Sequence, residues 1–370
     1  MRQNQPLVSI NILTYNGEKY IKECLNSVFN QEYSNIEILI IDNNSTDKRK
    51  SYLKKLKNRP ELKIIFNKKN LGYAGGHNQG IRISQGKYIL CLNQDVRLDR
   101  YFIKNAVCLL EKDKKIGAIQ GKLLRWNLGN TSLEISDKND VFYIIDTVGL
   151  CILKNRRIIN IAQGEIDQKQ FEKEQEIFGA DGAAPVYRRE ALEDIKIVLS
   201  RLRSNRASAR SQNYSRIKDL DNLGEYFDEN FFLYKEDVDL AWRLRLYKWK
   251  TIYQPKSVAW HDRSSGESAS ISYLAMIKER RKINKFAKYL AFKNQRLMQI
   301  KNEQFGILIK HLPWFLPKEI LSWLYVMLFE KYTWKAIRDL FGQSPLSWEK
   351  RKIIMAHKKA GIKEMEKWFN

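Results

Sequence analysis

The sequence predicts an α/β fold, in which a mostly parallel sheet is flanked by helices, followed by a helical extension. Strand and helix signals alternate through the first hundred residues. The apolar runs at 36–41 and 88–92 are continuous, as expected for parallel strands buried on both faces. Beyond residue 265 the pattern changes to long, Lys-rich helical segments with interleaved aromatic residues. We therefore expect an α/β domain at 1–265 and a basic, amphipathic helical extension at 266–370.

The first elements follow from the spacing of apolar residues. Strands are expected at 7–13, 36–41, 62–66 and 88–92, with helices at 18–30 and 76–84. This order indicates a doubly wound sheet, and ligands of such sheets bind beyond the carboxyl ends of the strands. Polar clusters lie at those ends, at 14–17, 42–45 and 93–95.

The middle of the chain gives weaker signals. A hairpin is expected around 141–161, and a helix and then a strand between 231 and 260. The segment 195–218 holds seven basic residues and no acidic one, without apolar periodicity. We expect it to be a mobile basic loop.

Charge is the unusual property of the composition. The formal net charge is +24, and half of it lies in residues 266–370. Such an excess predicts an anionic partner: a nucleic acid, an anionic lipid surface or a phosphorylated substrate. The four cysteines form no C-x-x-C pair, so we expect free thiols, buried where they lie in apolar segments, in a reducing compartment.

Targeting and membrane signals are not evident. The first residues do not form a secretory leader, and the chain has no uninterrupted apolar run of about 18 residues. We expect a cytoplasmic protein.

Two segments are candidates for nucleotide binding. Asp42 follows a buried strand, where a carboxylate can bond a ribose or base, although Asp, Asn and Ser are also common in turns and caps. The glycine-rich segment 70–80 leads into a helix and lets the backbone approach a diphosphate. Its spacing matches neither a Walker loop nor a dinucleotide fingerprint, and glycines also serve tight turns and close helix packing.

A metal site is expected after the strand at 88–92. Asn93-Gln94-Asp95 supplies one carboxylate, and a leaving diphosphate needs a cation such as Mg²⁺ or Mn²⁺ to neutralise its charge. His261 is the natural second ligand; imidazole suits Mn²⁺, whereas Mg²⁺ prefers oxygen. The alternative is a partly buried structural histidine.

Glu236 and Asp237 are the catalytic candidates. They begin a predicted helix, where acidic residues are also favoured by the helix dipole. In a functional role, Asp237 removes a proton from an acceptor hydroxyl. Asp228 and Glu229 are the alternatives.

Taken together, these motifs resemble family 2 glycosyltransferases with the Rossmann-like GT-A fold, particularly the rhamnosyltransferase-like branch. The resemblance covers about residues 7–262. It rests on the order of the segments 8–16, 41–47, 70–80, 92–96, 182–184, 231–239 and 260–261.

The resemblance implies roles for individual residues. Asp237 would be the base of an inverting, single-displacement transfer, while Asp95, completed by His261, would bind the metal. The family's D-x-D signature is Asn93-Gln94-Asp95 here. The donor site would be formed by Thr14, Tyr15, Asn16, Asp42, Asn44, Asn78, Asn93 and Gln94.

The resemblance also suggests the substrates. The leading donor is dTDP-L-rhamnose, followed by UDP-hexoses. The acceptor would be a hydroxyl of a glycan or lipid-linked saccharide in cell-surface polysaccharide synthesis. The basic loop at 195–218 is unusual for this family. From its residues alone we hypothesise that it closes over a lipid-linked diphosphate acceptor, because its arginines could pair with phosphate (Arg201, Arg203, Arg206, Arg210 and Arg216).

The aromatic, basic C-terminal extension suggests a location. Residues 311–329 suit an interfacial helix pair, so we expect a peripheral protein on the anionic inner face of the plasma membrane. Packing on the α/β domain or a second subunit is the alternative, and homo-oligomer formation stays open. Rival functions are a nucleic-acid-binding protein, which no recognition motif supports, a nucleotidyltransferase and a non-catalytic relative.

Overall fold

The computed structural model describes residues 5–56, 59–126, 135–137, 140–199, 224–263 and 280–370. Most of the expected basic loop, including its five arginines, and the expected boundary near residue 265 lie outside these ranges.

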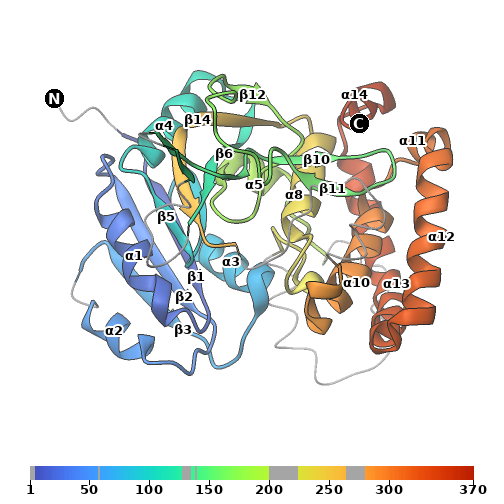
Figure 1. The fold of residues 1–370 in the computed structure, drawn as a ribbon, viewed down its shortest axis with the longest axis horizontal. Coiled ribbons are helices and arrows are strands. Elements are labelled where there is room, and N and C mark those ends of the chain that lie inside the picture. Colours follow the sequence, from blue (N-terminus) through green and yellow to red (C-terminus); the bar gives the residue numbers. More distant parts are fainter. Residues whose placement is uncertain (1–4, 57–58, 127–134, 138–139, 200–223, 264–279) are drawn as a thin grey trace.

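The predicted strands form a mostly parallel sheet (Figure 1). Its first four strands are β1 (Val8–Thr14), β2 (Ile36–Asp42), β3 (Leu62–Phe66) and β4 (Tyr88–Asn93), all parallel. The strand order is β12-β14-β6-β13-β4-β1-β2-β3. The second half consists of β6 (Ile116–Arg125), β12 (Gln175–Glu176), β13 (Val186–Arg188) and β14 (Lys250–His261), and β13 runs antiparallel to both neighbours.

Shorter strands complete the chain's β-structure. β5 (Val96–Leu98) pairs with β14, and β9 (Ile145–Thr147) pairs with β6. The hairpin expected around 141–161 is present as β10 (Leu150–Ile152) and β11 (Ile158–Asn160), which are antiparallel. A further two-stranded ribbon consists of β7 (Ile135–Asp137) and β8 (Asp140–Phe142).

Helices cover both faces of the sheet. α1 (Glu18–Phe29) and α4 (Phe102–Lys112) bury their apolar residues in one core cluster with the side chains of β1. α3 (Gly72–Ile83), α5 (Arg189–Asp194) and α8 (Glu236–Leu246) contribute to a second cluster on the opposite face. α2 (Arg49–Lys55) follows β2, and a short 3₁₀ turn, η1 (Glu229–Phe231), precedes α8.

The glycine-rich segment lies inside a helix rather than in a loop before one. α3 begins at Gly72, four residues before the expected start. A Cβ on Gly76 would lie 2.3 Å from Leu13 Cδ1, and one on Gly80 would lie 2.9 Å from the Asn11 amide. These glycines therefore allow α3 to pack closely on β1, which was the structural alternative for this segment.

The C-terminal helices continue the core of the α/β part. They are α10 (Lys285–Asn302), α11 (Phe305–Lys310), α12 (Leu312–Phe329), the 3₁₀ turn η2 (Lys331–Thr333), α13 (Trp334–His357) and α14 (Ile362–Glu366). Leu297, Ile354 and Phe369 share one apolar cluster with Tyr73 and Trp242 of the α/β part. The extension thus packs directly against the helices beside the sheet.

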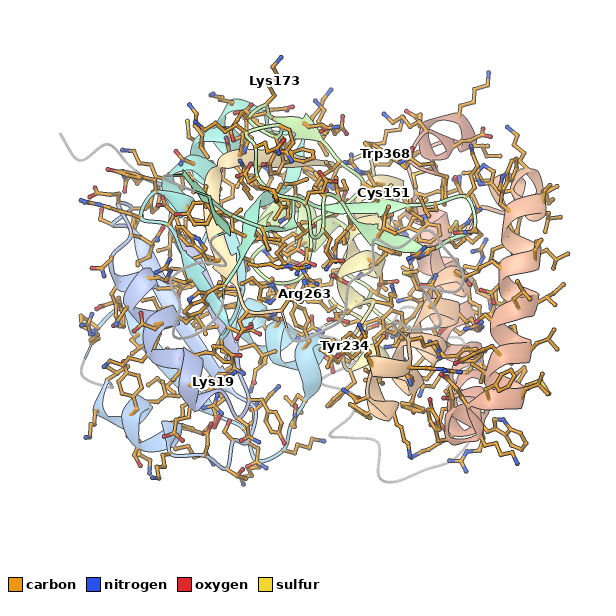
Figure 2. All side chains as sticks on the ribbon, viewed as in Figure 1. Lys19, Cys151, Lys173, Tyr234, Arg263 and Trp368 are labelled. Atoms are coloured by element: carbon orange, nitrogen blue, oxygen red, sulfur yellow. The ribbon has the colours of Figure 1, made fainter. Side chains whose placement is uncertain are left out.

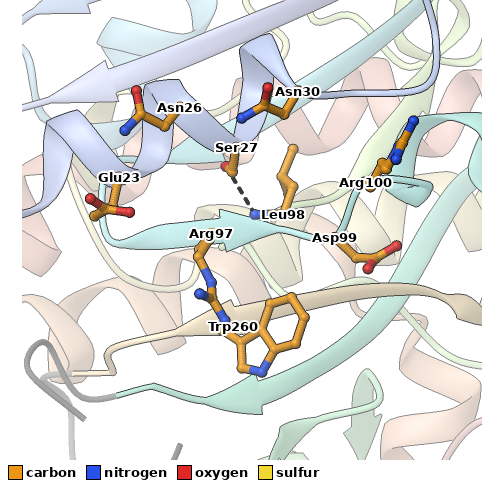
Figure 3. A pocket seen from close by; sticks show the side chains of 9 residues that line it. All are labelled: Glu23, Asn26, Ser27, Asn30, Arg97, Leu98, Asp99, Arg100 and Trp260. Atoms are coloured by element: carbon orange, nitrogen blue, oxygen red, sulfur yellow. Dashed lines mark hydrogen bonds between the residues drawn. The ribbon is translucent and has the colours of Figure 1, made fainter. Parts of the chain in front are cut away.

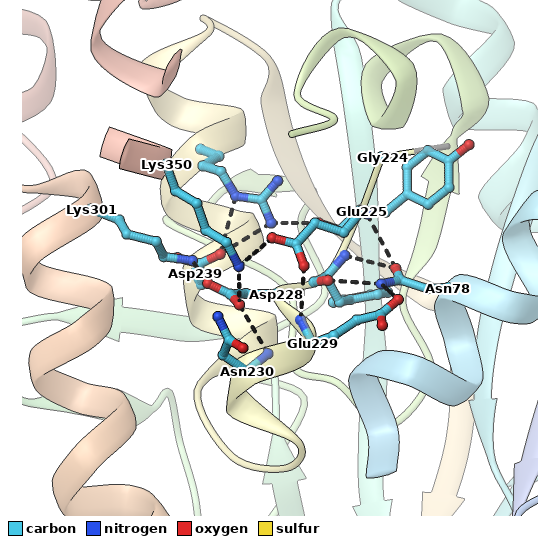
Figure 4. A network of polar contacts seen from close by, with 12 residues as sticks. Asn78, Gly224, Glu225, Asp228, Glu229, Asn230, Asp239, Lys301 and Lys350 are labelled. Atoms are coloured by element: carbon cyan, nitrogen blue, oxygen red, sulfur yellow. Dashed lines mark hydrogen bonds and ion pairs between the residues drawn. The ribbon is translucent and has the colours of Figure 1, made fainter. Parts of the chain in front are cut away.

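Buried ion pairs join the same two parts (Figure 4). The Lys301 ammonium on α10 lies 2.5 Å from an Asp228 oxygen and 2.8 Å from an Asp239 oxygen, and all three side chains are fully buried. Lys350 on α13 contacts the other Asp228 oxygen at 2.5 Å. These cations hold the pKa of Asp228 well below its usual range despite burial. Part of the chain's positive charge is therefore internal.

α12 lies at the outer edge of the molecule (Figure 1). Many of its apolar side chains are exposed. Within the described ranges, no helix is long and apolar enough to cross a membrane. The large exposed side chains on α12 are Leu312, Trp314, Leu316, Ile320, Leu321, Leu324, Met327, Leu328 and Phe329.

All four cysteines are free thiols, as expected. Cys24 and Cys91 are buried, whereas Cys108 is exposed, contrary to the expectation from its apolar segment. The reason is that α4 is amphipathic and Cys108 falls on its outer face.

Candidate active site

The predicted polar residues meet at one end of the sheet because their strands are parallel and in register. Thr14 pairs with Asp42 across β1 and β2, and Leu13 pairs with Asn93 across β1 and β4. Each strand therefore delivers its last polar residue to the same edge.

Gln94 joins the strand ends instead of pointing freely into solvent. Its Oε1 accepts hydrogen bonds from Thr14 Oγ1 at 2.6 Å and from the Tyr15 amide at 3.1 Å, while its Nε2 donates to the Tyr15 carbonyl. The fully buried Arg49 also donates to Gln94 and lies 3.7 Å from Asp42. Sequence reasoning missed Arg49, because a single arginine at a helix start carries no recognisable pattern.

The loops after β1 and β2 support each other. Asn16 and Asn44 both adopt left-handed backbone, at φ 45° and 64°, which asparagine tolerates better than most residues. The Asn16 side chain accepts a hydrogen bond from the Thr46 amide at 2.9 Å. The Tyr15 ring beside them is 46% exposed, so it is free to contact a ligand.

Asn78 does not join this group. Its Nδ2 donates to the Phe227 carbonyl and to Glu229, and its Oδ1 accepts from the Tyr226 and Phe227 amides. The side chain is fully buried and its hydrogen-bonding groups are all used. It connects α3 to the segment before α8 (Figure 4), and its place in the donor site stays a prediction.

The two expected metal ligands lie together. His261, the last residue of β14, pairs with Val96 of β5, which places its ring beside Asp95. His261 Nε2 lies 3.7 Å from Asp95 Oδ1, and His261 Nδ1 lies 2.9 Å from Asp146 Oδ2. Burial opposes protonation of the ring, but the hydrogen bond and charge of Asp146 outweigh it and raise the pKa of His261.

These donors fit a divalent cation. A carboxylate oxygen and an imidazole nitrogen face each other, and a second carboxylate orients the ring through its other nitrogen, as at many metal-binding histidines. This set suits Mn²⁺ better than Mg²⁺. Among the described residues no three His, Cys, Asp or Glu side chains cluster around one point, so a bound ion would need further ligands from substrate and water.

A chain of charged contacts leads from this pair towards Asp237. Arg263 donates to both oxygens of Asp146, at 2.6 and 2.9 Å, and to Asp181 at 2.9 Å. The backbone amide of Gly182, the next residue, donates to Asp237 Oδ2 at 3.1 Å. Arg263 lies near the middle of the molecule as it is viewed in Figure 2.

Asp237 has the properties of a general base. Burial and the nearby charge of Asp181 raise the pKa of Asp237 to about 6. The backbone amides of Gly182 and Val238 fix its two oxygens. Glu236 is more deeply buried, and burial together with the Asp237 charge raises the pKa of Glu236 well above its usual value. Glu236 is buried at the start of α8, whereas Asp237 is only partly buried and held by two backbone amides, so Asp237 is the better placed of the two to accept a proton.

The alternative bases are engaged elsewhere. Asp228 is buried between Lys301 and Lys350, and Glu229 pairs with Arg82. Neither faces the chain of contacts around Arg263.

A separate hollow lies on the other side of β14 (Figure 3). It has a volume of about 660 Å³ and is bordered by α1, β5 and Trp260. Successive side chains of a strand point to opposite faces, so Trp260 points away from the His261 site. Arg97 lies over the Trp260 ring at 4.4 Å. This hollow is therefore distinct from the candidate active site.

The parallel sheet, the polar strand ends and the carboxylates beside them define a protein of the GT-A glycosyltransferase fold. The family model described as Glycosyl transferase family 2 matches residues 9–196, half of the chain. The chain belongs to this family.

Individual relatives agree with this assignment. An uncharacterized glycosyltransferase of Haemophilus influenzae is 39% identical over 118 residues, which cover 32% of this chain and 36% of that protein. A poly-beta-1,6-N-acetyl-D-glucosamine synthase of Staphylococcus epidermidis is 22% identical over 261 residues, covering 68% and 49%. The chain thus spans a third to a half of these relatives' lengths.

The fold itself is shared with a solved structure of GalNAc-T7 with UDP, GalNAc and Mn²⁺. The TM-score is 0.52 at 12% identity, and the match covers 84% of this chain and 55% of that one. At this identity the likeness concerns the fold alone.

Proposed function

We propose that the protein is an inverting glycosyltransferase that moves a sugar from a nucleotide sugar to an acceptor hydroxyl. The observation that carries this proposal is the state of Asp237: a carboxylate with a pKa of about 6, fixed by two backbone amides. It is connected through Asp181 and Arg263 to the Asp95–His261 pair. Such a transfer requires a base at the acceptor side of the reacting sugar and a cation at its diphosphate side.

The donor would occupy the strand ends. The exposed Tyr15 ring and the loops bearing Asn16 and Asn44 would contact the nucleoside, with Asp42 behind them. Asn93 and Gln94 would form the floor of the donor site, because Gln94 already holds Thr14 and Tyr15 through hydrogen bonds. Arg49 supplies buried positive charge beneath this floor.

Asp95 and His261 would hold a divalent cation, Mn²⁺ or Mg²⁺, which neutralises the leaving diphosphate when bound. Asp146 would keep His261 Nε2 directed to the ion. Against the effect of burial, the hydrogen bond with His261 and the charge of Arg263 together hold the pKa of Asp146 below its usual range. The GalNAc-T7 structure, which contains Mn²⁺, supports this part of the proposal.

The transfer would be a single displacement. Asp237 takes the proton of the acceptor hydroxyl as its oxygen attacks the anomeric carbon, and the bond to the donor diphosphate breaks. Because the acceptor oxygen attacks once, from the side opposite the leaving diphosphate, the anomeric configuration inverts.

The proposal also covers the sugar donor, the acceptor and the location of the protein. The motif pattern favours dTDP-L-rhamnose as the donor, with UDP-hexoses next, and a glycan or lipid-linked acceptor in cell-surface polysaccharide synthesis. The exposed apolar face of α12 would lie on the anionic inner face of the plasma membrane, with 1–265 and 266–370 as the transferring and membrane-contacting parts. Internal pairing of Lys301 and Lys350 weakens the case for nucleic acid, because these cations cannot reach phosphates.

The test is release of nucleoside diphosphate from a panel of nucleotide sugars, with Mn²⁺, Mg²⁺ or EDTA. Wild type is compared with Asp237→Asn, and with Glu190→Gln as the control for loss of an exposed carboxylate elsewhere. We expect metal-dependent turnover of one donor, reduced at least a hundredfold in Asp237→Asn and unchanged in the control. Turnover that survives in Asp237→Asn would exclude this residue as the base.

A further inference from the structure

Tyr73, the second residue of α3, contacts both of the segments that place Asp237. Its side-chain hydroxyl donates a hydrogen bond to the Gly182 carbonyl at 2.7 Å. Its backbone amide donates to the Phe232 carbonyl at 2.7 Å, in the stretch that leads into α8. Gly182 in turn donates its amide to Asp237 Oδ2, and Asp237 is the second residue of α8. One residue of α3 therefore holds both the residue that bonds the proposed base and the chain that carries the base.

The stretch before α8 needs such support, because its backbone is unusual. Three residues other than glycine have a positive φ there: Phe232 at 63°, Tyr234 at 69° and Lys235 at 75°. The Leu233 amide donates to the Phe231 carbonyl at 2.7 Å, which makes Phe232 the centre of a γ-turn of the rare, strained kind. Such backbone persists only where surrounding contacts fix it. Asn294 of α10 bonds three carbonyls of this stretch, and the Tyr73 amide bonds the carbonyl at the centre of the turn.

The Gly182 side is also fixed. The residue before Gly182 donates its amide to Gln120 of β6 at 2.7 Å, and the carbonyl of the residue after it accepts from the Asn93 amide of β4 at 2.9 Å. The Tyr73 hydroxyl holds the Gly182 carbonyl between these two anchors. A Cβ on Gly182 would lie 3.3 Å from Tyr73 Oη and 3.4 Å from Asp237 Oδ2, so glycine lets both groups approach closely.

The Tyr73 ring is itself held in place and does not titrate with Asp237. The ring is buried, its centroid lies 4.3 Å from that of His77, and Phe227 contacts it edge-on at 5.4 Å. Burial raises the pKa of the Tyr73 hydroxyl well above its usual value and lowers the pKa of His77 to about 3. Tyr73 therefore keeps its proton, and His77 stays neutral, over the range in which Asp237 changes its charge.

Several groups act on Asp237 besides the Gly182 amide. The titratable ones are Asp181, Lys235, Glu236, Tyr73 and Tyr187. Burial and the charge of Asp181 raise the pKa of Asp237, whereas the Gly182 amide lowers it by bonding the carboxylate form. A weaker contact from this amide would therefore raise the pKa of Asp237 further.

We propose that Tyr73 is a positioning residue for the base, because its hydroxyl and its backbone amide fix Gly182 and the turn at Phe232, and through them the Asp237 carboxylate. This inference rests on the proposed function and assigns a further residue to the same site. Tyr73 acts through its neighbours, so its own proton is not transferred. The glycine-rich segment thus contributes to the acceptor side of the site as well as to the packing of α3.

NMR of the aspartate carboxyl carbons tests this without donor, acceptor or turnover. The full chain is labelled with ¹³C at these carbons and titrated around pH 6, and the Asp237 signal is the one that Asp237→Asn lacks. Wild type is compared with Tyr73→Phe, which keeps the ring and removes only the hydroxyl. Tyr33→Phe is the matched control, because Tyr33 is also buried and donates to a backbone carbonyl, that of Pro6, at the opposite end of β1.

We expect Tyr73→Phe to raise the pKa of Asp237 by about 0.5 to 1, as a displaced amide loses part of a charge-assisted hydrogen bond. Tyr33→Phe should leave this pKa as in wild type, although it also loses one buried hydroxyl. An unchanged or lower pKa in Tyr73→Phe, or an equal rise in Tyr33→Phe, would overturn the proposal. A donor panel without turnover would instead count against the proposed function, since the titration needs no substrate.

Discussion

Removal of the Lys301 ammonium should destabilise the whole protein, not only its C-terminal helices. Lys301, Asp228 and Asp239 are fully buried, and the ammonium lies 2.5 and 2.8 Å from the two carboxylates. In Lys301→Met the volume is nearly kept, but two buried carboxylates lose a shared cation. Breaking such a pair from one side costs about 3–5 kcal/mol. With an unfolding entropy of roughly 0.8 kcal/mol/K for a chain of this length, the melting temperature should fall by about 4–6 °C.

The assay is thermal unfolding followed by circular dichroism, with urea unfolding as a second measure. Lys310→Met is the control, since the Lys310–Glu366 pair is 55% and 32% exposed and should contribute at most about 1 kcal/mol. If Lys301→Met unfolds at the same temperature as Lys310→Met, the buried network does not stabilise the contact between the two parts of the chain as argued.

Three further predictions concern the site and the surface. The logarithm of kcat/KM should rise with unit slope to about pH 6 and stay level above it, because Asp237 must be ionised to accept a proton and burial raises its pKa from an ordinary 3.8; a profile without a break between pH 5 and 7 would contradict this. Asp146→Asn should raise the Mn²⁺ concentration for half-maximal activity about 10- to 100-fold, as expected when the group that orients a ligand histidine is weakened, whereas an unchanged requirement would exclude His261 as a ligand. Replacing Trp314 and Leu324 by Ser should reduce co-sedimentation with anionic liposomes several-fold and leave melting temperature nearly unchanged, since both are about half exposed; undiminished binding would locate the membrane contact elsewhere.

The sheet was predictable because its strands are buried on both faces. The continuous apolar runs of β2 and β4 leave few alternatives, and parallel pairing then brings Thr14, Asp42 and Asn93 to one edge. Asp95 and His261, more than 160 residues apart, were placed together from motif order, and the structure brings them within 3.7 Å.

Other parts of the site carry no periodic signal. Asp146 and Arg263 each stand alone in the sequence, beside a strand end. Only the fold shows that Asp146 holds the His261 ring and that Arg263 holds Asp146. Asp181 directly precedes the Gly182-Ala183-Ala184 motif, so extending that motif by one residue could have found it. The internal hydrogen bonds of Asn78 were also hidden, because a polar residue in a glycine-rich segment does not reveal whether its bonds are internal.

The contact between the C-terminal helices and the α/β part was also hidden. Lys301 and Lys350 contribute to the basic composition that indicates an anionic partner, yet both are buried against carboxylates. Net charge counts such residues in the same way as exposed ones, although only exposed cations attract a membrane or substrate.

The anomeric configuration of the transferred sugar tests the central claim most directly. Proton NMR of the early product, formed from the donor that the panel identifies, gives the coupling at the anomeric carbon before mutarotation or further reaction. One base, Asp237, and direct attack by the acceptor predict inversion relative to the nucleotide sugar. Retention would require a second displacement or a different reacting face, and would contradict the role assigned to Asp237.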